Sequence, residues 1–351
     1  MIAGASASCG IVRRDAPPSS EGAGAIGRKL MEFDVTLADI EAAAKRIAGR
    51  VRRTPTYVSP ALSERLGVET VVKFEGLQDA GSFKVRGCYN KLLSLTEDER
   101  QRGVVTTSGG NHAIAVSHVA GRLGIDALVL MPKVTPAFNI GLTKAAGGNI
   151  ELCEDAAEAF AKAEAYGKAG RTFVHPYDDP LIIAGHGTLG LEMLDDGGAL
   201  THAFFSIGGG GFGAGVAAAL KGRNPAVRIH GVETEGAETM TRALAEDKPV
   251  TIKPSSLART LGAPFVTDRT LAAAKRFLEE VVIVSDHDAV AELLDLLRSE
   301  RVLVEPAASA VVAAALARRS RFKKGDRVGL ILCGSNAAFG DVLEWKGRFG
   351  L

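Results

Sequence analysis

Residues 206–213 read S-I-G-G-G-G-F-G, with an apolar, strand-like run before them and a helix expected from Gly213. Bare glycines let successive backbone N–H groups converge on an anion, and the amino end of a helix adds positive potential. Four glycines in a row are also costly in chain entropy. The stretch therefore predicts a phosphate-binding loop, built by Gly208, Gly209, Gly210 and Gly211 with the N–H of Phe212.

Two ligands suit such a loop, and a tight turn without any ligand is the third alternative. In a dinucleotide fold, Gly208, Gly210 and Gly213 satisfy G-x-G-x-x-G. Glu233 would then hold a ribose, because it follows Gly213 by 20 residues at the end of the next strand. The other interpretation is a cup for a single phosphate, which leaves fewer of the chain's other motifs unexplained.

Working outward from this loop, strand-like and helix-like segments alternate along the chain. This alternation predicts an α/β fold of mostly parallel sheets flanked by helices. Strands are expected at residues 71–74, 104–107, 127–131, 150–153, 172–174, 203–207, 227–232 and 328–332. Helices are expected at residues 82–95, with Ser82 as a cap, and at 111–123, 136–146 and 156–168.

The same alternation suggests a division into two lobes. Residues 1–30 are rich in Gly, Ala, Ser and Pro, and we expect a disordered leader there. Residues 104–172 hold a compact set of strand–helix units and are predicted to form a small inserted domain. Residues 31–103 and 173–351 would form the large domain, and a ligand would sit in the cleft between the lobes.

Composition narrows the class of protein. The formal net charge is +1 and the basic residues are scattered, so neither a nucleic-acid nor a membrane partner is indicated. No apolar run reaches the ~18 residues that span a bilayer. The chain has four cysteines and no C-x-x-C pair, which favours reduced thiols in a cytoplasmic protein.

Several further motifs occur in a fixed order. They are K-F-E-G-L-Q-D-A-G-S-F-K-V-R-G at 73–87, S-G-G-N-H at 108–112, H-P-Y-D-D-P at 175–180, A-G-H-G-T at 184–188, V-E-P at 304–306 and C-G-S-N at 333–336. With the glycine loop, this series resembles the fold-type II pyridoxal-phosphate (PLP) enzymes, especially the threonine/serine dehydratase and serine racemase group. The resemblance covers residues 35–340 and implies the two-lobed architecture of tryptophan synthase β-like enzymes.

The resemblance implies a role for each matching residue. Lys84, preceded by Phe83, would carry PLP as a Schiff base, and the glycine loop would hold its phosphate. Asn111 would contact the ring hydroxyl, and Cys333 would face the pyridine nitrogen as a neutral group, so that the ring is a weaker electron sink. The remaining implied contacts are Glu305 for the cofactor and Ser108, Gly109, Gly110, Asn111 and His112 for the substrate.

Without the resemblance, Lys84 would be read as a solvated lysine, the 108–112 turn as an ordinary helix cap, and Cys333 as a core residue.

The resemblance implies a reaction: the chain is expected to convert a β-hydroxy amino acid to a 2-keto acid and ammonia. Threonine, serine, hydroxyaspartate and phenylserine stay open as substrates, because residues 257–264 depart from the threonine dehydratases.

The alternatives are a racemase or a β-replacement synthase of the same fold, an NAD(P)-dependent dehydrogenase, and a non-catalytic protein that stores the cofactor. A glycine at position 109, where a racemase of this group has a proton-donating serine, favours elimination. No metal is expected: Glu233 is a weak candidate, since Thr239 stands where a second carboxylate would be, and a surface carboxylate is its other interpretation. A homodimer is implied by the resemblance alone.

Overall fold

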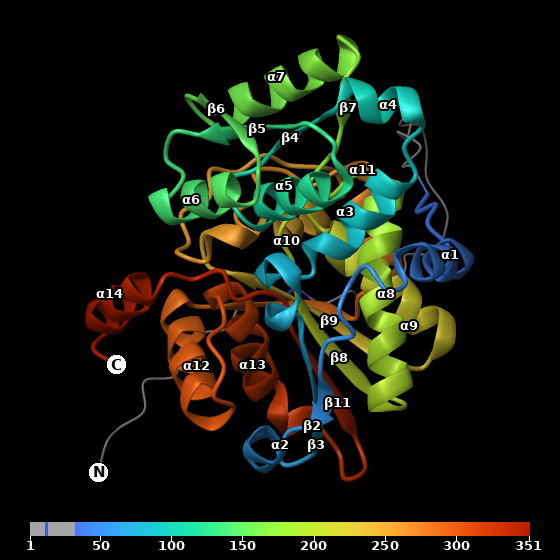
Figure 1. The fold of residues 1–351 in the computed structure, drawn as a ribbon. Coiled ribbons are helices and arrows are strands. Elements are labelled where there is room, and N and C mark those ends of the chain that lie inside the picture. Colours follow the sequence, from blue (N-terminus) through green and yellow to red (C-terminus); the bar gives the residue numbers. More distant parts are fainter. Residues whose placement is uncertain (1–10, 13–31) are drawn as a thin grey trace, which may run out of the picture.

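The computed structural model describes residues 11–12 and 32–351, and it builds them around two sheets (Figure 1). The larger sheet has the strand order β1-β10-β9-β8-β11-β3-β2, and the smaller sheet has the order β6-β5-β4-β7. The larger sheet comprises β1 (Ile11–Val12), β2 (Thr56–Val58), β3 (Glu69–Phe74), β8 (His202–Ser206), β9 (Arg228–Thr234), β10 (Glu280–Val284) and β11 (Arg327–Leu332). The smaller sheet comprises β4 (Val104–Thr107), β5 (Ala127–Pro132), β6 (Asn149–Cys153) and β7 (Thr172–Phe173).

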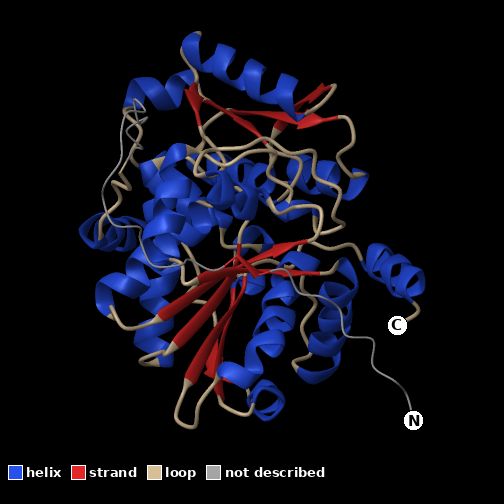
Figure 2. Cartoon of the chain, turned by 180° about the vertical axis from the view of Figure 1, so that it is seen from behind, coloured by secondary structure: helices blue, strands red, loops and turns tan. Residues whose placement is uncertain are grey.

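Helices cover both sheets, and Figure 2 shows them flanking the fan of strands. In Figure 1, α3, α5 and α6 are drawn between the two sheets. The helices are α1 (Leu37–Ile47), α2 (Pro60–Leu66), α3 (Lys84–Leu93), α4 (Glu97–Arg102), α5 (Asn111–Leu123), α6 (Ala137–Ala145), α7 (Ala156–Lys168), α8 (Pro180–Gly197), α9 (Gly211–Arg223), α10 (Thr239–Glu246), α11 (Asp268–Phe277), α12 (Asp286–Ser299), α13 (Pro306–Arg318) and α14 (Phe339–Phe349). No helix in the described part of the chain is both long and apolar enough to cross a membrane.

The predicted fold class is confirmed. Every described pairing between the named strands is parallel except those of the two edge strands, β1 and β2. All five residues of β8 are buried, as expected for a parallel strand whose two faces are both covered by helices. The alanine-rich helix α13 is almost wholly buried, because its small side chains allow close packing against the sheet.

Some boundaries agree with the sequence and others do not. Helix α5 spans the predicted residues and ends at Gly124, which takes the left-handed conformation with φ of 69°. The predicted cap at Ser82 is wrong, because this residue is extended and forms a β-bridge with Gly334, and α3 begins only at Lys84. The extended residue places the lysine beside the end of β11.

Two predictions about organisation concern the leader and the division into two lobes. Of the leader predicted over residues 1–30, Ile11 and Val12 pair with β10 as strand β1, and the rest lies outside the described residues. All four strands of the smaller sheet fall within residues 104–173. The division of the chain into two domains at these limits stays a prediction, which limited proteolysis between the sheets would check.

Candidate active site

Three neighbouring strands of the larger sheet end at the same edge. Strand β11 pairs in parallel with β3 on one side and with β8 on the other. The segment after β3 leads to Lys84, the residue after β11 is Cys333, and β8 leads into the glycine loop. Because carboxyl ends of parallel strands meet at one edge of a sheet, the chain brings these three predicted elements together there.

The glycine loop has no room for side chains. A β-carbon on Gly211 would lie 2.1 Å from the carbonyl oxygen of Tyr177, and one on Gly209 would lie 2.3 Å from the Tyr177 ring. Gly210 has a φ of 92°, which few other residues adopt. Helix α9 begins at Gly211, so its free N–H groups and positive end face the loop. This geometry suits an anionic group.

Lys84 lies at the start of α3 with a partly exposed side chain. Its Nζ donates a hydrogen bond to the carbonyl oxygen of Pro176 at 2.6 Å and lies 5.3 Å from the centre of the Phe83 ring. Burial lowers the pKa of Lys84 to about 8, because the charged ammonium is poorly solvated there. A lysine in this state is a far better nucleophile and base at neutral pH than an ordinary one.

Phe83 links the lysine to the glycine loop. Its ring stacks on that of Phe212, the second residue of α9, with 4.0 Å between ring centres. Its backbone N–H donates to the carbonyl oxygen of Cys333 at 3.2 Å. Burial raises the pKa of the Cys333 thiol, so this group is neutral.

A buried carboxylate organises the opposite side of the site. Glu305 Oε1 accepts hydrogen bonds from Asn111 Nδ2 at 2.7 Å and from the Asn336 N–H at 3.0 Å, and Oε2 accepts one from Thr260 Oγ1 at 2.9 Å. Asn336 Nδ2 also donates to Asn111 Oδ1 at 2.7 Å, which fixes the orientation of that amide. Burial raises the pKa of Glu305, and the three donors oppose this shift.

The predicted substrate loop, residues 108–112, joins β4 to α5. Ser108 Oγ accepts from the Gly110 N–H at 3.1 Å, and Asn139 Nδ2 donates to the Gly109 carbonyl at 2.8 Å. The ring of His112 is buried, with Nε2 3.2 Å from the Val174 carbonyl oxygen. Because the ring is engaged in this way, the group of His112 that remains available to an anion is its backbone N–H, which lies in the first turn of α5.

Glu233 lies outside this cluster of groups. It is fully buried, and its two oxygens accept from the Met240 and Thr241 N–H groups and from Thr241 Oγ1, at 2.7, 2.9 and 2.6 Å. The carboxylate thus stabilises the amino end of α10, and burial raises its pKa to about 7. The interpretations of Glu233 as a surface carboxylate and as a ribose-binding acid are wrong. Among the described residues, no group of three or more His, Cys, Asp and Glu side chains is placed to hold a metal ion.

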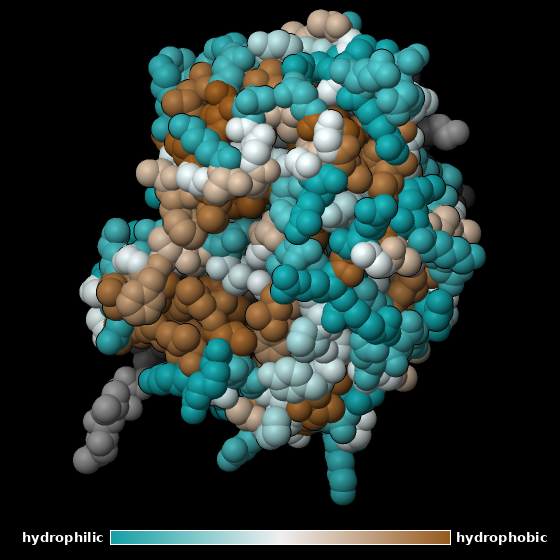
Figure 3. Space-filling model, in the orientation of Figure 1, coloured by the Kyte–Doolittle hydropathy of each residue, from teal (hydrophilic) through white to brown (hydrophobic). Residues whose placement is uncertain are grey.

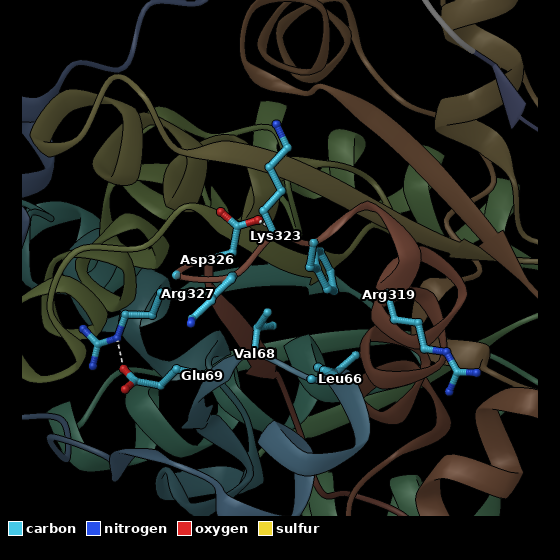
Figure 4. Close-up of a pocket in the computed structure, with 11 residues that line it drawn as sticks. Leu66, Val68, Glu69, Arg319, Lys323, Asp326 and Arg327 are labelled. Carbon is cyan, nitrogen blue, oxygen red and sulfur yellow. Dashed lines mark hydrogen bonds and ion pairs between the residues drawn. The ribbon is translucent and has the colours of Figure 1, made fainter.

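A groove of about 640 Å³ occurs at the other end of the larger sheet (Figure 4). It lies where β3 and β11 begin, and Arg327 pairs with Glu69 across it. Arg319, Lys323 and Lys324 also line it, but they are exposed side chains on the surface. This groove is remote from the strand ends that carry Lys84 and the glycine loop.

The structure adds residues that the sequence did not single out. Thr260 contacts both predicted ligand loops, because its carbonyl lies 3.2 Å from a β-carbon built on Gly208 and its methyl lies 3.4 Å from one built on Gly110. The unusual sequence of residues 257–264 was a signal for this position. No comparable signal pointed to Asn139 or Thr135, which reach the substrate loop from the segment after β5.

A family model described as pyridoxal-phosphate dependent enzyme matches residues 47–334, so the chain belongs to this family. Among its relatives, the L-threonine ammonia-lyase of Thermotoga maritima is 37% identical over 308 residues, which cover 86% of this chain and 76% of that protein. The phenylserine dehydratase of Ralstonia pickettii is 36% identical over 321 residues, covering 90% and 98%. The structure of maize serine racemase matches with a TM-score of 0.83 at 30% identity and covers 90% of this chain and 97% of that chain.

The residues of the site fit pyridoxal phosphate. A lysine with a lowered pKa suits a covalent link to an aldehyde, and the side-chain-free glycine loop at the start of α9 suits the phosphate. The neutral thiol of Cys333 suits an unprotonated ring nitrogen. Lys84, the loop 208–212, Asn111 and Cys333 are the groups that would hold the cofactor.

Proposed function

We propose that the chain is a PLP-dependent lyase that converts a β-hydroxy amino acid to a 2-keto acid and ammonia. The observation that carries this proposal is Lys84, a half-buried residue whose amine has a lowered pKa. It starts α3 beside the end of β11, and Phe83 links it to the glycine loop. The dehydratase and ammonia-lyase names of the relatives support the same reaction.

Each residue of the site has a task in this reaction. Bound PLP supplies the electron sink for the pair of electrons left on the substrate's α-carbon. The neutral amine of Lys84 accepts the α-proton, since its pKa of about 8 leaves a useful basic fraction at neutral pH. The free N–H groups at the start of α5 bind the substrate carboxylate, and Glu305 and Asn336 hold Asn111 in place.

Elimination is favoured over racemisation by the environment of Gly109. Glycine has no side chain to return a proton, and a β-carbon built at this position would lie 2.6 Å from Thr135 Oγ1. A seryl side chain therefore fits at this position only if the Thr135 hydroxyl moves. Racemisation needs a group that returns a proton to the α-carbon from the Gly109 side. Elimination does not, because the β-hydroxyl is lost instead.

A keto-acid release screen tests the proposal. Purified protein loaded with PLP is incubated with L-threonine, L-serine, 3-hydroxyaspartate and phenylserine, and keto acid and ammonia are quantified together. We expect equal amounts of both products from at least one substrate, and none from Lys84→Ala. Inverted amino acid without keto acid would instead identify a racemase. Full keto-acid release by Lys84→Ala would overturn the assignment of the base.

The proposal includes a homodimer and a cytoplasmic location. Phe339 and Leu343 lie one helical turn apart on α14, and 62% and 55% of their surfaces are exposed. Figure 3 shows apolar surface on the side of the larger sheet where α12 and α14 lie, which supports contact with a second copy. Light scattering of wild type and Leu343→Asp tests the dimer.

Three buried free cysteines, Cys88, Cys153 and Cys333, are consistent with a reducing compartment.

A further inference from the structure

Thr135 fills the space beside Gly109 that a side chain at position 109 would occupy. A β-carbon built on Gly109 would lie 2.6 Å from Thr135 Oγ1 and 3.5 Å from both Cβ and Cγ2 of the same residue. The hydroxyl is therefore the part of Thr135 that points at Gly109. The Thr135 hydroxyl thus borders Gly109 from the segment after β5.

The hydroxyl of Thr135 is not used within the protein. The residue is 9% exposed, no described residue shares a hydrogen bond with Oγ1, and this oxygen is not among the described side-chain atoms shut off from solvent. An accessible, unpaired hydroxyl that borders a ligand loop is placed to bind a partner from outside. The backbone holds the residue in place, because the Thr135 N–H donates to the Pro132 carbonyl at 2.9 Å.

The surroundings of Thr135 favour an anionic oxygen as that partner. Helix α5 begins just after Gly109 and Gly110, so the positive end of the helix lies beside Thr135. Asn139 donates to the carbonyl of Gly109 at 2.8 Å, and the Gly110 N–H donates to Ser108 Oγ at 3.1 Å, so the donors that remain here are the N–H groups of Asn111 and His112 in the first turn of α5. Donors from two segments, the loop after β4 and the segment after β5, thus meet around Gly109.

We propose that Thr135 is a substrate-binding residue whose hydroxyl donates a hydrogen bond to the α-carboxylate of the bound amino acid. This inference rests on the proposed function, because it takes an amino acid as the ligand of the 108–112 loop. It extends the substrate site across the smaller sheet from β4 to the segment that follows β5. Selectivity for the carboxylate then depends on a side chain 26 positions beyond Gly109.

The test compares Thr135→Val, which replaces the hydroxyl by a methyl group, with Thr135→Ser, which keeps it. Thr172→Val is the matched control, because Thr172 also belongs to the smaller sheet but pairs with Val104 at the opposite end of β4. The PLP-loaded proteins are titrated with L-alanine by calorimetry. L-Alanine has no β-hydroxyl, so its binding is measured without elimination. KM and kcat are measured with a substrate from the keto-acid screen.

Thr135→Val should raise the Kd of L-alanine and the KM roughly 10- to 100-fold, the range for one hydrogen bond to a charged group. Its kcat, and all values for Thr135→Ser and Thr172→Val, should stay within about threefold of wild type. Equal Kd values for wild type and Thr135→Val would overturn the proposal, as would a wild type that binds no L-alanine. A wild type that binds L-alanine but releases no keto acid would overturn the proposed function alone.

A second measurement keeps the inference testable if Thr135→Val folds poorly. Gly109→Ser should weaken L-alanine binding in the wild-type background, because its β-carbon collides with the Thr135 hydroxyl. In the Thr135→Ala background the collision is gone and the new serine supplies a hydroxyl in the same volume. Gly109→Ser should then improve binding relative to Thr135→Ala alone. Additive losses in the two backgrounds would show that positions 109 and 135 do not share this space.

Discussion

Raising the pH through about 8 should accelerate covalent uptake of an aldehyde by cofactor-free protein, because only the neutral amine of Lys84 attacks a carbonyl. Burial lowers the pKa of Lys84 to about 8. The neutral fraction grows as the pH rises, so the uptake rate increases about tenfold per pH unit below 7 and levels off above about 9. The rate rises with pH because, below the pKa of Lys84, protonation removes the reactive neutral amine. Above this pKa nearly all of the amine is neutral, so the rate levels off.

The size of the effect follows from the same pKa. At pH 7 roughly one tenth of the Lys84 amines are neutral, against about 0.04% for an ordinary lysine with a pKa near 10.4. Lys84 should therefore react roughly 200-fold faster at pH 7 than a solvated lysine of equal intrinsic reactivity. The hydrogen bond from Nζ to the Pro176 carbonyl must be broken before attack, which reduces this advantage.

The assay mixes cofactor-free protein with PLP or with pyridoxal and follows the absorbance of the imine over time. Pyridoxal lacks the phosphate, whose second pKa near 6 would otherwise add its own pH dependence. The midpoint near pH 8 should appear with both aldehydes, and pyridoxal should bind much more weakly. Lys91→Ala is the matched control, because Lys91 lies on the same helix and its amine pairs with Asp179 at 2.7 Å. A midpoint near pH 10 in wild type, or unchanged uptake by Lys84→Ala, would refute the reasoning.

Three further predictions concern the framework. Gly211→Ala should reduce PLP affinity by about 100-fold, measured by fluorescence titration, because its β-carbon would lie 2.1 Å from the Tyr177 carbonyl oxygen and move the loop. Arg86→Leu should lower the free energy of unfolding in urea by about 3–5 kcal/mol, since it leaves the buried carboxylate of Glu75 without the guanidinium 2.8 Å away. Burial alone would raise the pKa of Glu280, but hydrogen-bonded cations lower it to about 2. Glu280→Gln should therefore cost about 2–3 kcal/mol above pH 5. The gap to wild type should narrow as the pH falls toward 3, because the unfolded wild-type chain binds a proton at the ordinary carboxyl pKa while the folded carboxylate stays ionised down to about 2. A constant gap would contradict this pKa.

The sequence predicts the layout of the fold well, because glycine turns and apolar strands are local signals. The helix 111–123 and the loop 208–211 follow from such signals. Ser82 shows the limit: its residue type predicts a helix cap, but pairing with Gly334, distant in sequence, keeps it extended. Glu233 shows the same limit for burial, since only the folded chain brings the amino end of α10 to its carboxylate.

The residues around the predicted substrate loop depend on contacts between segments that are distant in sequence. Asn111 could be singled out by its motif, but its partners Glu305 and Asn336 come from the far end of the chain. Thr135 lies in a segment with no distinctive pattern, and its importance comes only from the missing side chain of Gly109. Such pairings become visible when the two sheets are placed in one structure.

Adjacent strands β8, β11 and β3 deliver the glycine loop, Cys333 and Lys84, whereas Thr135 and the 108–112 loop belong to the other sheet. Mutations in the segment after β5 can therefore accumulate without touching the residues predicted to hold the cofactor, whereas Asn111 of the 108–112 loop is one of those residues. Substrate specificity can thus change during evolution while the cofactor-binding residues stay the same. A designer seeking a new specificity should randomise the segments after β4 and β5 while keeping Asn111 and the three-strand edge.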